Sequence, residues 1–393
     1  MKRKSIVVKI GNIFIGGENP VIIQSMAEKR TEKKEEVLKE IKELIEAGSE
    51  MVRIAVNTEE ATKAVPFIIE ELKDKGYNIP IIGDFHFNGA YLLKKFPQTA
   101  KILDKYRINP GTTVHQKDFD EMIKIAIEND KPVRIGGNLG SVDKKILDEK
   151  IKENKDFKKS LREISLEALI ESVIRSAERA IEIGLAENKI ILSAKTSDVK
   201  DLIYVYRELA KRTRFPLHIG LTEAGGDIKG IVSSSIGIGT LLLEGIGDTI
   251  RVSLTERKDE SRRKEVEVAK EILQALNLRR FHPEIISCPG CGRTDSEIFK
   301  EIAEKIDNYL KTKRKEWEKI YPHFKELKIA IMGCVVNGPG EAKFADLALC
   351  LPGKGEKKAT IYKDGNFLKN VKIENAEEEF KVEIENYLKG RTK

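Results

Sequence analysis

Eight short apolar segments, each followed by a segment with helical spacing of apolar residues, constrain the fold of this chain more than any other feature. The apolar segments lie at 21–25, 51–54, 80–84, 106–109, 133–136, 190–195, 217–220 and 250–254. Intervening segments such as 33–48 carry one apolar helical face and end in glycine, which favours helix termination. Strands that alternate with helices form parallel sheets, and eight such units are the count of a closed (β/α)8 barrel.

An open, doubly wound α/β sheet is the alternative for this alternation. That fold carries a glycine fingerprint directly after its first strand, and no such fingerprint follows residues 21–25. We therefore predict an α/β protein, a TIM barrel followed by a small α+β domain. Residues 142–184 are too many for one barrel helix, and we expect two helices there.

The length of 393 residues exceeds that of a usual single domain. We place the barrel domain at residues 1–278 and the α+β domain at residues 279–393, with 279–283 as the linker. The pattern after the linker predicts a strand at 284–287, a helix at 295–319, a strand at 327–332, short strands within 344–351 and 360–371, and a last helix at 376–388.

Composition excludes several classes of protein. Apolar residues make up 40% and charged residues 34%, as in water-soluble globular proteins, and no apolar stretch is long enough to cross a membrane. The four cysteines predict a reducing compartment rather than a disulfide framework. The net charge of +7 is spread along helices, so we expect neither nucleic-acid nor membrane binding. We expect a cytoplasmic protein.

Cations stand at the ends of five different predicted strands. They are Arg53, Arg107, Arg134, Lys195 and Arg251, with Asn138 and Ser253 near them. Barrel closure brings such strand ends to one mouth, where the active sites of this fold form. A single cation there would be an ion-pair partner, whereas five predict a phosphate or diphosphate ligand held by forked guanidinium groups. We expect the glycine-rich run 233–239 to open the next helix and to add backbone N–H donors.

Two acidic residues at the same rim are candidates for proton chemistry. Asp84 ends the third predicted strand, and it serves equally well as a substrate-binding residue or as a carboxylate that holds an arginine in place. Glu223 follows the seventh strand among small residues that leave it accessible. We predict that Glu223 is catalytic. His86 and His218 are expected to be interior histidines with satisfied ring nitrogens rather than ligands.

Three of the four cysteines lie in two loops rich in glycine and proline. Cys288 and Cys291 share one turn, and Cys334 follows an apolar run in the second. Glycine and proline let the backbone bend tightly around an ion, so three thiolates from two loops predict a metal or iron–sulfur site.

The number of thiols narrows the kind of metal site. A structural zinc site usually has four protein ligands, whereas the second loop offers one cysteine without a nearby histidine. A cubane cluster usually takes four cysteines, so three leave one position to a weaker ligand. Glu341 and Cys350 are the candidates for that position. We favour Glu341, because a carboxylate is the more exchangeable ligand.

Several motifs together resemble one family. They are CPGCGRT and MGCVVNGPGEA around the cysteines, and IIQSM, RINPG, RIGGNLGS, LTEAGG and EGIGDTIRVSL along the barrel. Over nearly the whole chain these resemble the 4-hydroxy-3-methylbut-2-enyl diphosphate synthase family, in its compact bacterial two-domain form. The resemblance implies an enzyme of the methylerythritol phosphate route to isoprenoids. It would convert 2-C-methyl-D-erythritol 2,4-cyclodiphosphate to (E)-4-hydroxy-3-methylbut-2-enyl diphosphate by reductive ring opening and dehydration.

The same resemblance implies a cofactor, partners and roles for residues. A 4Fe–4S cluster would be held by Cys288, Cys291, Cys334 and Glu341, with Glu341 also catalytic. The diphosphate would be bound by the five cations with Asn138 and Ser253, and Glu223 would be the signature glutamate. The resemblance further implies a homodimer, an oxidoreductase and a ferredoxin or flavodoxin as electron donor. The chain departs from the family at Ala27-Glu28, at Thr112 and at Cys350, where a small apolar residue is expected.

Two other functions remain compatible with the residues. The first is a phosphosugar aldolase or isomerase barrel with a structural metal domain. The second is a non-enzymatic cluster carrier or electron-transfer module, which would not need five cations at a barrel mouth.

Overall fold

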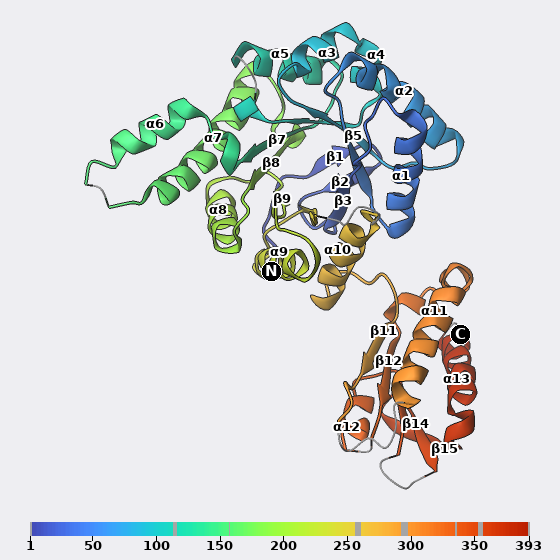
Figure 1. The fold of residues 1–393 in the computed structure, drawn as a ribbon. Helices are drawn as coiled ribbons and strands as arrows, with labels where there is room; N and C mark the ends of the chain where they lie inside the picture. The colour runs from blue at the N-terminus through green and yellow to red at the C-terminus, as the bar shows by residue number, and fades with distance from the viewer. Residues whose placement is uncertain are drawn as a thin grey trace. The chain divides into compact units, whose positions relative to one another are not determined.

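The computed structural model describes residues 2–112, 116–156, 158–255, 261–291, 298–334, 336–352 and 357–391 (Figure 1). The chain divides into two compact units, Met1–Arg279 and Arg280–Lys393. Each unit has its own sheet and its own hydrophobic core.

The first unit is a (β/α)8 barrel, which confirms the predicted fold. Its eight parallel strands are hydrogen-bonded in the order β8-β7-β6-β5-β4-β3-β10-β9. A parallel bridge between Leu192 and Leu217 joins β8 to the residue before β9 and closes the ring. The strands are β3 (Ile22–Met26), β4 (Met51–Ala55), β5 (Ile81–Phe85), β6 (Lys105–Ile108), β7 (Val133–Asn138), β8 (Ile190–Lys195), β9 (His218–Ile219) and β10 (Thr249–Ile250).

Helices surround this ring of strands (Figure 1). They are α1 (Lys34–Ala47), α2 (Glu59–Asp74), α3 (Gly89–Lys95), α4 (Pro97–Ile102), α5 (Gln116–Glu128), α6 (Lys144–Glu153), α7 (Leu161–Ile183), α8 (Val199–Arg212), α9 (Asp227–Leu243) and α10 (Arg263–Ala275). Residues 142–184 hold two helices, as predicted, and α7 begins at a capping box formed by Ser160 and Glu163. Among the described residues, no helix is both long and apolar enough to cross a membrane.

A hairpin that the sequence reading missed precedes the barrel. Its strands β1 (Val8–Ile10) and β2 (Ile13–Ile15) pair antiparallel. Val8, Ile10 and Ile15 are fully buried against residues near the amino-terminal ends of barrel strands, among them Ile22 and Met51. The hairpin therefore packs on the end of the barrel opposite the predicted active site.

The second unit is a five-stranded mixed sheet in the order β11-β12-β13-β14-β15. The first three strands are parallel, and the last two are antiparallel to their neighbours. The elements are β11 (Glu284–Ser287), α11 (Ile298–Ile320), β12 (Lys328–Met332), α12 (Gly338–Ala342), β13 (Leu347–Cys350), β14 (Lys358–Lys363), β15 (Asn366–Lys372) and α13 (Ala376–Arg391). The predicted helix start at residue 295 lies outside the described residues.

The two faces of this sheet carry different cores. Ile329 and Ile331 face a large core with α11 and α13, which includes Trp317 and Phe380. The alternate residues of β12 face a smaller core with Ala342, Ala348 and Cys350, on the side of α12. This alternation follows from the period of two along a strand. Both cores hold the carboxyl ends of β11, β12 and β13 at one edge.

Candidate functional site

Five predicted cations lie inside the mouth of the barrel. They are Arg53 on β4, Arg107 on β6, Arg134 on β7, Lys195 on β8 and Arg251 directly after β10. Arg134 is only 1% exposed, and the side chains of Arg53 and Arg251 are 11% and 12% exposed. The strand register places Arg107 opposite both Asp84 and Arg134 on its two neighbours. The sheet therefore brings the predicted cations together.

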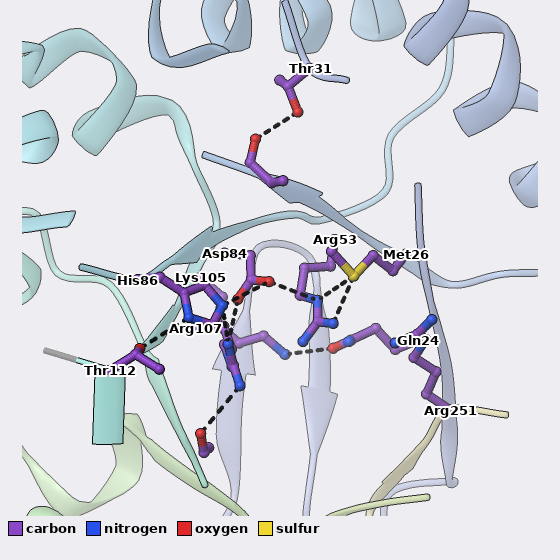
Figure 2. A network of polar contacts seen from close by, with 12 residues as sticks. Gln24, Met26, Thr31, Arg53, Asp84, His86, Lys105, Arg107, Thr112 and Arg251 are labelled. Carbon is purple, nitrogen blue, oxygen red and sulfur yellow. Dashed lines mark hydrogen bonds and ion pairs between the residues drawn. The ribbon is translucent and has the colours of Figure 1, made fainter. Parts of the chain in front are cut away.

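Asp84 anchors two of these arginines (Figure 2). Its Oδ1 accepts a hydrogen bond from Nη1 of Arg107 at 3.0 Å, and its Oδ2 lies 3.8 Å from Nε of Arg53. Burial alone would raise the pKa of Asp84, but the charges of Arg53 and Arg107 hold it well below its usual range. Asp84 is thus ionised at neutral pH and is an anchor for arginine, not a proton donor.

Three of these cations keep buried nitrogens that have no acceptor among the described residues. Buried nitrogens without a hydrogen-bond partner include Nε and Nη1 of Arg134, Nε of Arg107 and Nε of Arg251. Arg53 donates to the thioether sulfur of Met26 at 2.7 and 3.2 Å, which is a weak acceptor. A buried donor without an acceptor is costly, so this arrangement favours an anionic ligand.

Burial and mutual repulsion act on the protonation of the cluster. Desolvation lowers the pKa of Lys195 well below its ordinary value, and the nearby charges of Arg251 and Arg134 lower it further. Burial also lowers the pKa of Arg53 to about 9 despite Asp84. The arginines stay protonated at neutral pH, because guanidinium groups do not deprotonate in proteins. An anion at the mouth would therefore favour the charged form of Lys195.

Lys105 is a sixth interior cation that the sequence reading missed. It lies on β6 one pleat below Arg107, is 1% exposed, and donates to Oε1 of Gln24 at 3.2 Å (Figure 2). Desolvation and the charges of Arg134 and Arg53 lower its pKa well below the ordinary value. The predicted strand began at residue 106. Extending it by one residue would have placed Lys105 and Arg107 on the same face.

The two histidines have different environments. His86 lies at the mouth, where Nε2 contacts Nη1 of Arg107 at 2.6 Å and Nδ1 contacts the hydroxyl of Thr112 at 3.0 Å. Both of its ring nitrogens therefore have partners, as predicted, but its side chain is half-buried at the mouth rather than interior. His218 is fully buried with Nδ1 bonded to Thr249, but its Nε2 has no partner among the described residues. The prediction of fully satisfied ring nitrogens is wrong for His218.

The other predicted substrate contacts lie at or beyond the carboxyl ends of strands. Asn138 ends β7 and is in register with Lys195 on β8. Ser253 is half-buried, two residues beyond Arg251. Glu223 is exposed in the connection between β9 and α9, and its backbone has a φ of 55°, the left-handed region. A non-glycine residue held there marks local strain of the kind that clusters at functional sites.

The glycine-rich run 233–239 does not open a helix. It lies inside α9, which begins at Asp227 after Gly226. The backbone N–H groups of a helix interior are already hydrogen-bonded along the helix, so they cannot bind phosphate. The prediction of a phosphate-binding helix start at residues 233–239 is therefore wrong.

The three loop cysteines line one small cavity in the second unit. Its volume is about 130 Å³, and its lining consists of Cys288, Pro289, Gly290, Cys291, Met332, Gly333, Cys334 and Asn337. Cys288 follows β11, and Cys334 lies two residues beyond β12, so adjacent parallel strands deliver both sulfurs. The backbone N–H of Gly333 donates to Sγ of Cys288 at 3.3 Å, a contact that would stabilise a thiolate.

The donor set of this cavity fits an iron–sulfur cluster in its chemistry. Three sulfurs face one space, although no group of three or more His, Cys, Asp or Glu side chains within the described ranges is gathered closely enough for a single metal ion. Glu341 is half-buried in α12 and is not among the lining residues. Cys350 is 1% exposed, and burial raises the pKa of its thiol to about 12. Neither candidate for the fourth ligand lines the cavity.

Two family models match the chain. The model of the GcpE TIM-barrel domain matches residues 5–270, and that of the GcpE protein C-terminal domain matches residues 284–386. Among solved structures, the chain is similar to type I 3-dehydroquinate dehydratase from Clostridium difficile, with 18% identity, 71% of this chain and 98% of that chain covered, and a TM-score of 0.46. It is also similar to dihydropteroate synthase from Burkholderia cenocepacia, with 10% identity, coverages of 70% and 96%, and a TM-score of 0.45. Likenesses this distant carry no information about activity.

Proposed function

The chain belongs to the GcpE family, the 4-hydroxy-3-methylbut-2-enyl diphosphate synthases of isoprenoid biosynthesis, and we propose that its barrel mouth binds the cyclic diphosphate substrate. The family converts 2-C-methyl-D-erythritol 2,4-cyclodiphosphate to (E)-4-hydroxy-3-methylbut-2-enyl diphosphate. One observation supports this site above all others: the mouth gathers buried cations from separate strands, and Arg107, Arg134 and Arg251 each keep at least one buried nitrogen without an acceptor among the described residues. Two phosphoryl groups supply the oxygens that these donors need.

In this proposal the cations also act on the chemical step. When the ring opens, one carbon–oxygen bond breaks and its electron pair goes to a diphosphate oxygen. Guanidinium groups that are already in place stabilise that oxygen without reorganisation, and the loss of one such donor typically costs about 10²- to 10³-fold in rate. Asp84 positions Arg107 and Arg53, while Asn138 at the end of β7 and Ser253 beyond β10 would add neutral donors.

The cysteine cavity is the proposed cofactor site. Cys288, Cys291 and Cys334 would hold a 4Fe–4S cluster, with Glu341 as the exchangeable fourth ligand. Such a cluster supplies single electrons, and the overall reaction takes up two electrons and two protons and releases one water. We assign the protein to the oxidoreductases on this basis, with ferredoxin or flavodoxin as electron donor and a homodimer as the working assembly.

Glu223 is the proposed proton donor to the departing C3 hydroxyl. Its exposed carboxylate and its left-handed backbone in the connection after β9 support this role. We expect Glu223→Gln to lower kcat by about 10²- to 10⁴-fold with little change in KM, the usual effect of removing a general acid. Steady-state kinetics of a variant with unchanged iron content checks this, and full turnover would remove Glu223 from the role.

Anaerobic purification of the full chain tests the proposed function as a whole. We expect a brown protein that contains iron rather than zinc, bleaches in air, and consumes the cyclic diphosphate when supplied with a reductant. A colourless, air-stable zinc protein that leaves the cyclic diphosphate intact would instead favour an aldolase or isomerase barrel with a structural metal domain.

A further inference from the structure

A further arginine lies beside the cation cluster without belonging to any barrel strand. Arg262 immediately precedes α10, and its Nη1 donates to the backbone carbonyl of Met26, the last residue of β3, at 3.3 Å. Its Nε lies 3.8 Å from Oε2 of Glu28. The side chain of Arg262 is 22% exposed and that of Glu28 is 56% exposed. Arg262 thus stands at the rim, where an incoming ligand can reach it.

Met26 connects Arg262 to the cluster. The sulfur of Met26 accepts from Arg53, while its carbonyl accepts from Arg262, so both guanidinium groups contact one residue. Burial lowers the pKa of Arg53 and of Arg251, and the charge of Arg262 lowers both further. Three guanidinium groups therefore lie near the ends of β3, β4 and β10, which are adjacent in the barrel.

The contact between Arg262 and Glu28 is weak by its geometry. At 3.8 Å and with an exposed carboxylate, such an ion pair contributes little to stability. The backbone beside it is nevertheless fixed, because the N–H groups of Glu28 and Lys29 donate to the carboxylate of Glu40 at 2.8 and 2.9 Å. A fixed backbone thus keeps a loosely held carboxylate close to a cation at the mouth.

We propose that Arg262 is an additional cation of the anion site and that Glu28 is an internal competitor, which an incoming phosphoryl group displaces from Arg262. This inference rests on the proposed function of the barrel mouth. A phosphoryl group offers Arg262 two oxygens and a higher charge than the carboxylate at 3.8 Å does. Glu28 therefore shields Arg262 in the empty site and is repelled by the ligand in the filled one.

The alternative is that the pair only ties α10 to the β3–α1 connection. A tie that takes no part in anion binding leaves only the screened, long-range effect of one charge, so each single variant would then stay within about twofold of the wild type. The proposal requires opposite signs. Removing the cation must weaken anion binding, whereas removing the competing carboxylate must strengthen it.

Isothermal titration calorimetry of the full chain with inorganic pyrophosphate at low salt distinguishes the proposed competition from a purely structural ion pair. We expect Arg262→Gln to weaken binding about 10-fold and Glu28→Gln to tighten it about threefold, in line with the loss of one charge contact near a surface. The double variant should bind like Arg262→Gln alone. Changes that stay within twofold, or that run in the same direction in the two single variants, would overturn the proposal.

Two reference variants make each outcome interpretable. Arg30→Gln removes a cation from the same connection, but Arg30 is 75% exposed and pairs with Glu32, so pyrophosphate binding should stay within twofold of the wild type. Arg251→Gln tests the anion site itself and should weaken binding at least as much as Arg262→Gln does. If Arg251→Gln has no effect, the proposed function of the mouth fails; if only Arg262→Gln has none, the additional cation alone fails.

Discussion

The barrel mouth and the cysteine cavity both form where parallel strands end, but they are built in different ways. The cations of the mouth are strand residues or directly follow a strand, and neighbouring strands fix their side chains in register. The cysteines stand on loops beyond β11 and β12, and they range from buried Cys334 to exposed Cys291. Strand pairing alone positions the cations of the mouth, whereas the cysteines depend on the conformation of two loops.

This difference shows where each site obtains its geometry. Strand pairing sets the arrangement of charges at the mouth when the barrel folds, at the cost of several buried guanidinium nitrogens that lack acceptors among the described residues. The cysteine cavity has the right donors, but no closely gathered group of metal-binding side chains is present in the part of the chain that is described. Binding of a cofactor there should therefore be coupled to local ordering of the loops.

The largest effect should follow from removing one sulfur of the cavity. We expect Cys334→Ser to lose its iron and to lower activity by more than about 100-fold, which exceeds the loss typical of changes around intact ligands. Hydrogen exchange should then quicken at residues 288–291 and 333–334, while barrel strands stay protected. Iron assay and hydrogen exchange with mass spectrometry measure both.

Cys350→Ala is the matched control for this loss, because Cys350 is buried and does not line the cavity. It should keep its iron. Loss of iron from both variants, or unchanged protection of the loops without iron, would contradict the distinction between the two sites.

The next effect concerns the only carboxylate that the described structure pairs with both Arg53 and Arg107. Asp84→Asn leaves two buried guanidinium groups without their anion, and we expect it to lower the free energy of unfolding by about 3–5 kcal/mol. Chemical denaturation measures this value. Arg175, which forms ion pairs with Glu149 and Glu171 at the surface, offers a control. Arg175→Gln should lower the free energy of unfolding by no more than about 1 kcal/mol.

Asp84 also predicts how the stability of the protein changes with pH. The pKa of Asp84 is lower in the folded protein than the value of about 3.9 in an unfolded chain. Its contribution to stability is therefore fully present above about pH 4 and is lost as the pH falls below that value. Melting temperatures between pH 5 and pH 3 should fall less steeply for Asp84→Asn than for the wild type. Equal slopes would mean that Asp84 is not the ionised anchor.

The sequence was sufficient to predict the barrel fold and the interior position of most of its cations. Eight apolar runs separated by helical segments set the fold, and the position of Arg107 within its run placed it inside the barrel. The β1–β2 hairpin was not predictable in this way, because strands of three residues are too short to show a period. The interior position of Lys105 was not predicted, because a lysine at the start of an apolar run is more often exposed to solvent than buried.

Other features depend on three-dimensional contacts that no local pattern encodes. The left-handed backbone of Glu223 is imposed by its connection, since glutamate has no preference for that conformation. The glycines at 237 and 239 suggested a phosphate loop but lie inside α9, where Gly237 instead allows close approach of Leu202. Which side chain accepts from Arg53 likewise depends on the register between β3 and β4.

The last prediction concerns the smallest expected change in the free energy of unfolding. It tests whether the buried cations of the mouth destabilise the protein when no anion is bound. Arg134 is 1% exposed, has two buried nitrogens without acceptors among the described residues, and is repelled by Arg53 and Arg107. Because an apolar side chain of similar length removes this penalty, we expect Arg134→Met to raise the free energy of unfolding of the ligand-free protein by about 1–3 kcal/mol. The same change should lower kcat/KM by about 10²- to 10³-fold, because a preorganised donor to the diphosphate is lost. Chemical denaturation and steady-state kinetics on one preparation measure both quantities. A variant that is less stable as well as less active would show that Arg134 stabilises the barrel and is not held there only to bind an anion.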